Sequence, residues 1–163
     1  MPNPYRGEIP PDPGAGHPRG AEQIRAHWRR LTRLAFDEAL RRDPTLLARY
    51  DERSLRLFYR DYERHLEQLA RALASGSDGH VRRYGEWLVP VLRRRRMPTT
   101  DLLTFVGAMG PAVRTVLTPA EDEVAKGILD RWLARQRRNV RIAGDRKRNA
   151  VLRFFWKGVG ILD

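Results

Sequence analysis

Histidine and aspartate are the residue types in this chain that could hold a metal, and one pair of them has a useful spacing. His65 follows Asp61 by four positions, which places both side chains on one face of a helix. A usable metal site needs three or more protein ligands, and the Glu-x-x-His pairs of di-iron bundles do not occur in the sequence. We therefore interpret the two residues as an Asp–His pair on a solvated helix face and predict no metal site.

The sequence offers little for covalent or hydrolytic catalysis. It contains no cysteine, which excludes disulfides, cysteine nucleophiles, zinc–cysteine sites, iron–sulfur clusters and thioether-linked haem. Its serines are Ser54, Ser75 and Ser77, and the last two lie in a glycine-containing linker. Phosphate-binding loops, nucleophile elbows and His-Glu-x-x-His motifs do not occur. We predict that the chain is not an enzyme.

Haem bound without a covalent link would need an axial ligand, and His65 and His80 are the candidates for that role. His80 directly follows a glycine and reads as a residue at the start of a helix. A surface or helix-end histidine explains both positions more simply than an axial ligand does, so we expect no cofactor.

Arginine dominates the charge of the chain. There are 29 arginines against 3 lysines, and 32 bases face 20 acids, which gives a net charge of +12. A GC-rich coding sequence explains arginine over lysine but not the excess of bases over acids. An anionic partner, such as nucleic acid, a membrane surface or an acidic protein, explains that excess. The candidate anion-binding residues are Arg93, Arg94, Arg95, Arg96, Arg137, Arg138, Arg141, Arg146, Lys147 and Arg148.

The last third of the chain combines bases with aromatic residues. Ten bases lie from residue 131 to residue 157, Asp145 is the single acid among them, and the run Phe154-Phe155-Trp156 comes near the end. This composition suits phosphate contacts with base stacking, in a sequence-tolerant manner because no helix-turn-helix is evident. It also suits a helix in the interface of an anionic membrane. In a third interpretation, which we favour, the aromatic residues dock on the core of the domain or on a second subunit.

Helices must position these residues, because apolar residues recur at intervals of three and four and no alternating run appears. Residues 1–20 hold six prolines and four glycines and are expected to form an extended tail before a single helical domain over residues 21–163. A helix is expected from residue 21 to the Asp43-Pro44 pair, which also starts another helix before the turn at Tyr50-Asp51. Further helices are expected over 52–74, 80–96, 99–117 and 118–143, and again from Asp145, with Gly144 ending the preceding helix. No apolar run is long enough for a membrane span or a signal peptide, so a cytoplasmic location is the expectation.

The predicted core is rich in aromatic residues. The clearest apolar stripe runs through residues 55–73, and arginines and glutamates occupy the opposite face of that helix. The expected core residues are Trp28, Phe58, Tyr62, Leu66, Trp87 and Trp132. We also expect a homodimer through the helix over 118–143, with Trp132 at the interface.

Several short runs in the second half of the chain carry a resemblance to a known family. They are Arg82-Arg83-Tyr84-Gly85-Glu86-Trp87-Leu88, then Met97-Pro98 after a basic loop, then Thr100-Asp101-Leu102-Leu103, and finally the capped helix from Thr118 to Val140. The segment from about His80 to Val140 thereby resembles the globin-like sensory domains at the N-terminus of RsbR-type stressosome proteins. The resemblance implies a globin-like bundle that dimerises, usually holds no haem and regulates through protein contacts.

These observations together predict an all-α, globin-like bundle of about six helices that acts as a non-catalytic regulatory or protein-interaction module. The first alternative is an accessory factor that binds nucleic acid or a ribonucleoprotein through its arginine-rich C-terminal third. The second alternative is a peripheral membrane or complex-assembly subunit anchored by Phe154, Phe155 and Trp156.

Overall fold

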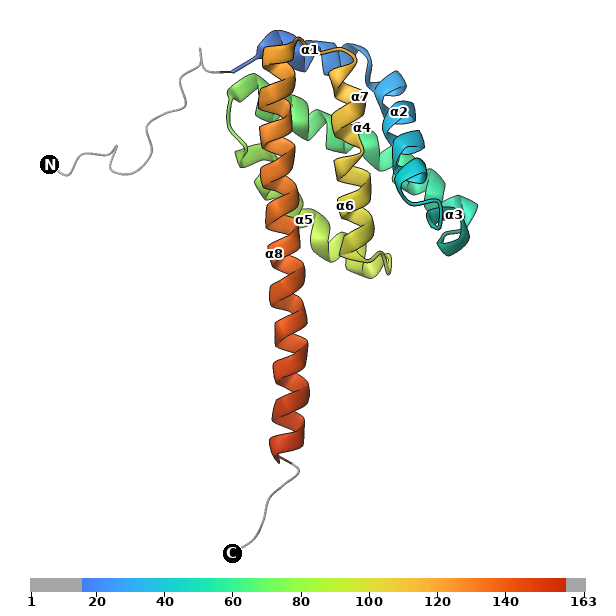
Figure 1. Cartoon of the computed structure of the whole chain (residues 1–163), viewed down its shortest axis with the longest axis vertical. Coiled ribbons are helices and arrows are strands. Elements are labelled where there is room, and N and C mark those ends of the chain that lie inside the picture. Colours follow the sequence, from blue (N-terminus) through green and yellow to red (C-terminus); the bar gives the residue numbers. More distant parts are fainter. Residues whose placement is uncertain (1–15, 158–163) are drawn as a thin grey trace, which may run out of the picture.

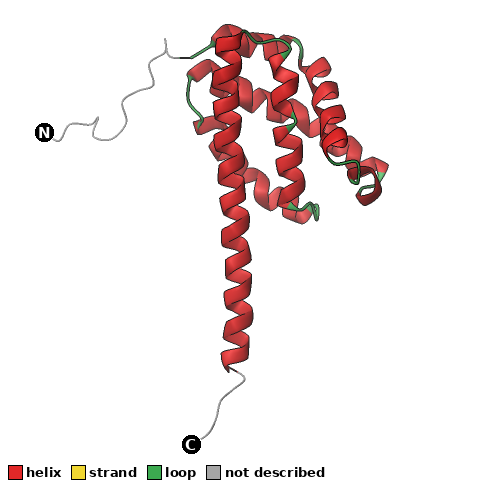
Figure 2. Cartoon of the chain, in the orientation of Figure 1, coloured by secondary structure: helices red, strands yellow, loops and turns green. Residues whose placement is uncertain are grey.

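The computed structural model describes the backbone of residues 16–157 and the side chains of residues 16–139, and every element in that range is a helix (Figures 1 and 2). The all-α class is therefore confirmed, with eight helices in the described range where about six were expected. They are α1 (Pro18–Ala26), α2 (Trp28–Arg42), α3 (Leu46–Arg49), α4 (Glu52–Ser75), α5 (Gly79–Arg94), α6 (Thr99–Gly107), α7 (Met109–Arg114) and α8 (Pro119–Lys157).

Helix α4 is the centre of the packing and contacts α1, α2, α5 and α8. It begins where the Asp51 carboxylate accepts a hydrogen bond of 2.8 Å from the backbone N–H of Ser54, which satisfies a free donor of the first turn. Its apolar stripe is buried as predicted, with the rings of Phe58 and Tyr62 near its middle. The Tyr62 hydroxyl donates to the carbonyl of Phe105 at 2.8 Å, so this buried polar group keeps a partner.

The predicted core is confirmed at Phe58, Tyr62, Leu66 and Trp132, whereas Trp28 is half-buried against it. The prediction for Trp87 was wrong, because 49% of this residue is exposed. The buried positions of α5 are Val81, Gly85, Leu88 and Leu92, which recur at intervals of four, three and four. Trp87 precedes Leu88 by one residue and therefore lies about 100° away around the helix.

The start of the domain lies earlier than predicted. Residues 16–20, which were expected in the extended tail, pack on the end of α4, and the His17 backbone N–H donates to the Leu73 carbonyl at 2.8 Å. Residues 1–15 lie outside the described range. The single helix expected over 21–42 is interrupted at His27, where α1 gives way to α2.

Helix α8 is one continuous helix, so the predicted break at Gly144 was wrong. A glycine inside a helix costs only about 1 kcal/mol relative to alanine, and the surrounding helix formers outweigh that cost. The capped start that the sequence indicated at Thr118 is a capping box. Glu121 Oε2 accepts from the Thr118 backbone N–H at 2.9 Å, and Thr118 Oγ1 accepts in return from the backbone N–H of Glu121 at 3.4 Å. Figure 1 shows the C-terminal half of α8 extending well beyond the other helices.

Between residues 16 and 157, none of the helices combines the length and the apolar composition that crossing a bilayer requires.

The buried position of Trp132 bears on the expected homodimer. Only 1% of this residue is exposed, because it packs inside its own protomer, so it is not the interface residue that the sequence suggested.

A candidate anion-binding groove between α4 and α5

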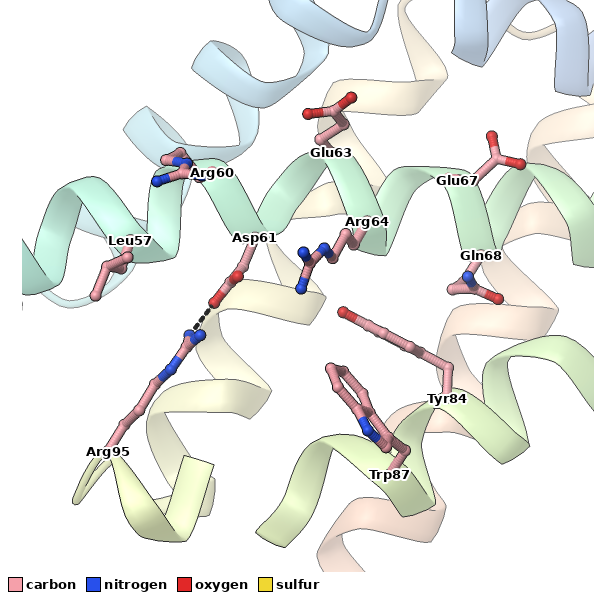
Figure 3. Close-up of a pocket in the computed structure, with 10 residues that line it drawn as sticks. All are labelled: Leu57, Arg60, Asp61, Glu63, Arg64, Glu67, Gln68, Tyr84, Trp87 and Arg95. Carbon is pink, nitrogen blue, oxygen red and sulfur yellow. Dashed lines mark hydrogen bonds and ion pairs between the residues drawn. The ribbon is translucent and has the colours of Figure 1, made fainter. Parts of the chain in front are cut away.

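An open groove of about 670 Å³ lies between α4 and α5 (Figure 3). One wall is the face of α4 opposite its apolar stripe, and the other wall is formed by α5 and the turn that follows it. Aromatic and charged side chains meet there from two separate segments of the sequence, residues 57–68 and residues 84–95. The lining residues are Leu57, Arg60, Asp61, Glu63, Arg64, Glu67, Gln68, Tyr84, Trp87 and Arg95.

Two aromatic rings from neighbouring turns of α5 form one side of the groove. Tyr84 and Trp87 are stacked, with ring centroids 5.7 Å apart and an angle of 29° between the ring planes. Trp87 is half-exposed, and its ring projects from α5 toward the groove in Figure 3. A tryptophan held in this way by a stacked neighbour presents a flat aromatic face to solvent at little cost in conformational entropy.

The arginines of the α4 wall are free to meet an anion. Arg60 and Arg64 are exposed, and neither forms an ion pair with another residue of the described range. Two of the three acids nearby are neutralised: Asp61 pairs with Arg95 at 2.5 Å, and Glu67 pairs with arginines of α1 and α4. Glu63 is the lining acid without such a pair among the described residues.

The basic surface continues along α4 toward its N-terminus. A second, shallower hollow of about 470 Å³ is lined by Glu52, Arg53, Arg56, Leu57 and Arg60. Arg56 pairs with Glu52 within the helix, while Arg53 has no ion pair in the described part of the chain. The arginines that the sequence placed on a solvated face of this helix thus form a stripe that leads into the groove.

The predicted anion-binding run Arg93 to Arg96 stands at the end of α5, and all four residues are exposed. Arg95 reaches across to Asp61, which ties this end of α5 to the middle of α4. Of the predicted run, Arg95 thus lines the groove together with Arg60 and Arg64. Sequence reasoning did not include those two arginines or Trp87 in the site, although the offset of Trp87 from the apolar stripe of α5 was the signal that could have found it.

His65 lies behind the groove rather than on its surface, so the predicted Asp–His pair on a solvated face was wrong. The residue is 5% exposed, and its Nδ1 shares a hydrogen bond of 2.8 Å with the Tyr84 hydroxyl. The rings of Tyr62, Tyr84 and Trp132 surround it edge-on. Burial, assisted by the charges of Arg64 and Arg95, lowers the pKa of His65 to about 3.

His80, the other haem-ligand candidate, lies in the first turn of α5 and is partly exposed. Burial and the charges of Arg83 and Arg71 lower its pKa. No group of three potential metal ligands occurs among the residues that the structure describes. The expectations of no metal and no cofactor stay predictions.

Among the anion-binding and interaction candidates in the C-terminal third of the chain, only two have side chains within the described range. Arg137 and Arg138 are exposed on α8. Farther along, the backbone is helical, but the side chains lie outside the described range; these candidates are Arg141, Arg146, Lys147, Arg148, Phe154, Phe155 and Trp156. Their roles therefore stay predictions.

Comparison with known proteins assigns no family to the chain. None of the known protein-family models matches the sequence, and no curated protein matches it either.

Proposed function

We propose that this chain binds single-stranded nucleic acid as a non-catalytic accessory factor, and that the groove between α4 and α5 is its contact surface. The observation that carries the proposal is the half-exposed ring of Trp87, stacked on Tyr84 in a groove that Arg60 and Arg64 also line. Proteins that bind single strands with little sequence preference combine aromatic rings for the bases with basic side chains for the backbone.

The two parts of the groove have separate tasks. An unpaired base stacks on the indole of Trp87, a contact open to every base because each has a π-face. Arg60 and Arg64, which line the groove, contact the phosphates. The exposed Arg93, Arg94 and Arg96 add positive charge at the end of α5. The Asp61–Arg95 pair keeps a carboxylate from repelling the strand, since its charge is already compensated at 2.5 Å.

Helix α8 supplies a second basic element. Its sequence from Arg131 to Lys157 carries ten bases against Asp145, and Figure 1 shows that the C-terminal half of the helix stands clear of the other helices. A helix of nearly uniform positive charge gains free energy when it meets a polyanion and releases its counterions. The nucleic-acid alternative drawn from the sequence assigned phosphate contacts to Arg93 to Arg96 and to this segment, and the groove adds a base-stacking site to them.

Fluorescence anisotropy with a labelled single-stranded oligonucleotide of about 12 nucleotides tests the proposal, because single-strand sites span about 4–16 nucleotides. The double substitution Arg60→Gln with Arg64→Gln is expected to weaken binding by about 30-fold, since each removes a phosphate contact worth on the order of 1 kcal/mol. The matched control is Arg30→Gln with Arg33→Gln on α2, which removes the same charge from exposed positions outside the groove. Equal affinities of the two double variants would contradict the assignment of the groove.

A second candidate function is the protein-interaction or regulatory module of globin-like type. The mixture of charges in the groove favours it: bases and acids line the same walls as Trp87, and Trp, Tyr and Arg are the residues that dominate the binding energy of protein interfaces. A second copy of the chain is the partner to test first. Sedimentation equilibrium of the wild type and of Trp87→Ala measures self-association. Protein interaction is supported over nucleic-acid binding if the wild type self-associates, the substitution abolishes that association, and the chain binds no oligonucleotide.

A further inference from the structure

One row of side chains on α4 faces α5 across the groove. Its members recur at intervals of four, three and four residues and therefore share one side of the helix. They are Leu57, Asp61, Arg64 and Gln68. In Figure 3, Arg64 and Gln68 project from α4 toward α5, whereas Glu63 and Glu67 project from its other side. The row is thus the part of α4 that faces a base stacked on Trp87.

Most polar groups in this part of the groove already have a partner. The Asp61 carboxylate pairs with Arg95 at 2.5 Å. The Tyr84 hydroxyl shares a hydrogen bond of 2.8 Å with Nδ1 of His65. Gln68 differs from them: it is half-buried in the groove wall, and its amide forms no hydrogen bond with another residue of the described range. This amide is therefore open to a ligand in the groove.

The chemistry of an amide selects one of the four bases. A glutamine side chain carries a donor and an acceptor in one plane. On its N7 side, adenine presents the matching pair, an acceptor at N7 and a donor at N6, and glutamine recognises this edge through two hydrogen bonds. Guanine presents two acceptors there, while cytosine and thymine each present a single polar group. An amide that meets this edge can therefore form both hydrogen bonds with adenine alone.

We propose that Gln68 makes the groove select adenine at the position stacked on Trp87. This inference rests on the proposed function, because it needs a base in the groove. The adenine ring stacks on the indole, Gln68 Nε2 donates to N7, and Gln68 Oε1 accepts from the N6 amino group. Arg64, the other member of the row without a partner among the described residues, contacts a phosphate and so reads no sequence. The ligand is then a single strand that contains adenine.

Fluorescence anisotropy with strands that differ at one base tests the inference. Labelled thymine strands of about 12 nucleotides carry adenine, guanine, cytosine or 7-deazaadenine at one central position. The 7-deazaadenine base keeps the ring and the N6 amino group but has a C–H in place of N7. The wild type is expected to bind the adenine strand about five- to tenfold more tightly than the other strands, the 7-deazaadenine strand included, because the paired hydrogen bonds carry the discrimination.

A variant assigns this preference to Gln68. Gln68→Leu removes the amide but keeps the approximate size and helix propensity of the side chain. It is expected to bind every strand within about twofold of the affinity that the wild type has for the all-thymine strand. The matched control is Gln23→Leu on α1, which removes an exposed amide outside the groove and should keep the wild-type preference. The 7-deazaadenine comparison needs the wild type alone, so it stands even if a variant folds poorly.

The outcomes separate this inference from the groove proposal. If the wild type binds the adenine strand no more tightly than the thymine strand or the 7-deazaadenine strand, the role of Gln68 is overturned and the groove proposal stands. A preference for adenine that Gln68→Leu retains would also overturn it, because stacking strength would then explain the preference. If the wild type binds none of the strands, the groove proposal fails and this inference fails with it.

Discussion

Arg96 adopts a backbone conformation that suits glycine better than arginine. Its φ angle is 55°, and it is the only non-glycine residue with a positive φ in the described range. The Arg96 N–H donates to the Arg93 carbonyl and the Met97 N–H donates to the Leu92 carbonyl, both at 3.0 Å, which is the pattern of a helix C-terminus closed by a left-handed residue. Helix α4 ends in the same way, but with Gly76 at the left-handed position. Arginine at this place is consistent with a use for its charge beside the groove.

The Arg96→Gly variant should therefore be more stable and bind more weakly. The left-handed conformation costs a non-glycine residue roughly 1–2 kcal/mol, so we expect the free energy of unfolding to rise by about 1 kcal/mol. Oligonucleotide affinity should fall, because one base is lost from the run at the end of α5. Urea unfolding and anisotropy measure the two effects. Gly76→Ala is the matched control, with an expected loss of about 1 kcal/mol, and a less stable Arg96→Gly variant would contradict the argument.

The burial of His65 makes stability depend on pH. Its pKa is about 3 in the folded state against 6.5 for an unperturbed histidine, so the unfolded chain binds the proton first as the pH falls. The contribution of His65 is complete above about pH 6.5 and is lost as the pH falls toward 3, by about 2 kcal/mol at pH 5. Urea unfolding at pH 7 and pH 5 measures this loss. His65→Phe should remove that part of the pH dependence, and an unchanged dependence in this variant would refute the assignment.

Among the short helices, α3 is held to α6 by a buried carboxylate. Asp101 is 4% exposed and accepts hydrogen bonds from Arg49 Nη2 at 2.8 Å and from the Tyr50 hydroxyl at 2.5 Å. Because removal of a buried acceptor leaves its donors unsatisfied, Asp101→Ala is expected to lower the free energy of unfolding by about 2–3 kcal/mol. Thermal or urea unfolding checks the value. Asp37→Ala on the exposed face of α2 is the control and should change stability by less than about 0.5 kcal/mol.

Helix α8 contains a packed part and a projecting part. Its buried residues in the described range are Ala125, Ile128, Leu129, Trp132 and Gln136. Beyond them the helix leaves the bundle in Figure 1. A chain that ends at Asn139 is therefore expected to unfold cooperatively, with a free energy of unfolding within about 0.5 kcal/mol of the full chain. Circular dichroism measures both helix content and unfolding. A truncated chain that no longer folds would show instead that the aromatic residues near the C-terminus belong to the core.

The elements that the sequence predicted well are those with strong local signals. The stripe of α4 repeats from residue 55 to residue 73, and the Thr118–Glu121 capping box marks the start of α8 without ambiguity. The errors came where local and tertiary effects compete. Gly144 was expected to end a helix that in fact continues. Trp87 was assigned to the core because its side chain is apolar, although its position lies off the buried stripe of α5. The groove could not be predicted, because it needs the crossing of two helices whose charged faces are far apart in the sequence.

At the scale of the whole molecule, the net charge of the sequence is +12, and the described residues form a small bundle from which one long helix projects. Such a distribution repels itself and attracts polyanions over distances comparable with the Debye length of about 8–10 Å. The groove lies along α5, and the arginine run stands at the end of the same helix. Helix α8, which carries the basic C-terminal sequence, packs against α5. A strand that follows these elements would release several counterions, so its affinity should fall steeply with salt.

The most direct test of the account is the affinity of Trp87→Ala for a single-stranded oligonucleotide, measured by anisotropy at low salt beside the wild type and Trp87→Phe. Stacking of one base is worth about 1–3 kcal/mol, so the alanine variant should bind about tenfold or more weakly, while phenylalanine retains most of the affinity. Because the side chain is half-exposed, the thermal unfolding midpoint should stay close to that of the wild type. Equal binding by the wild type and the alanine variant, or no binding by the wild type at low salt, would contradict the account.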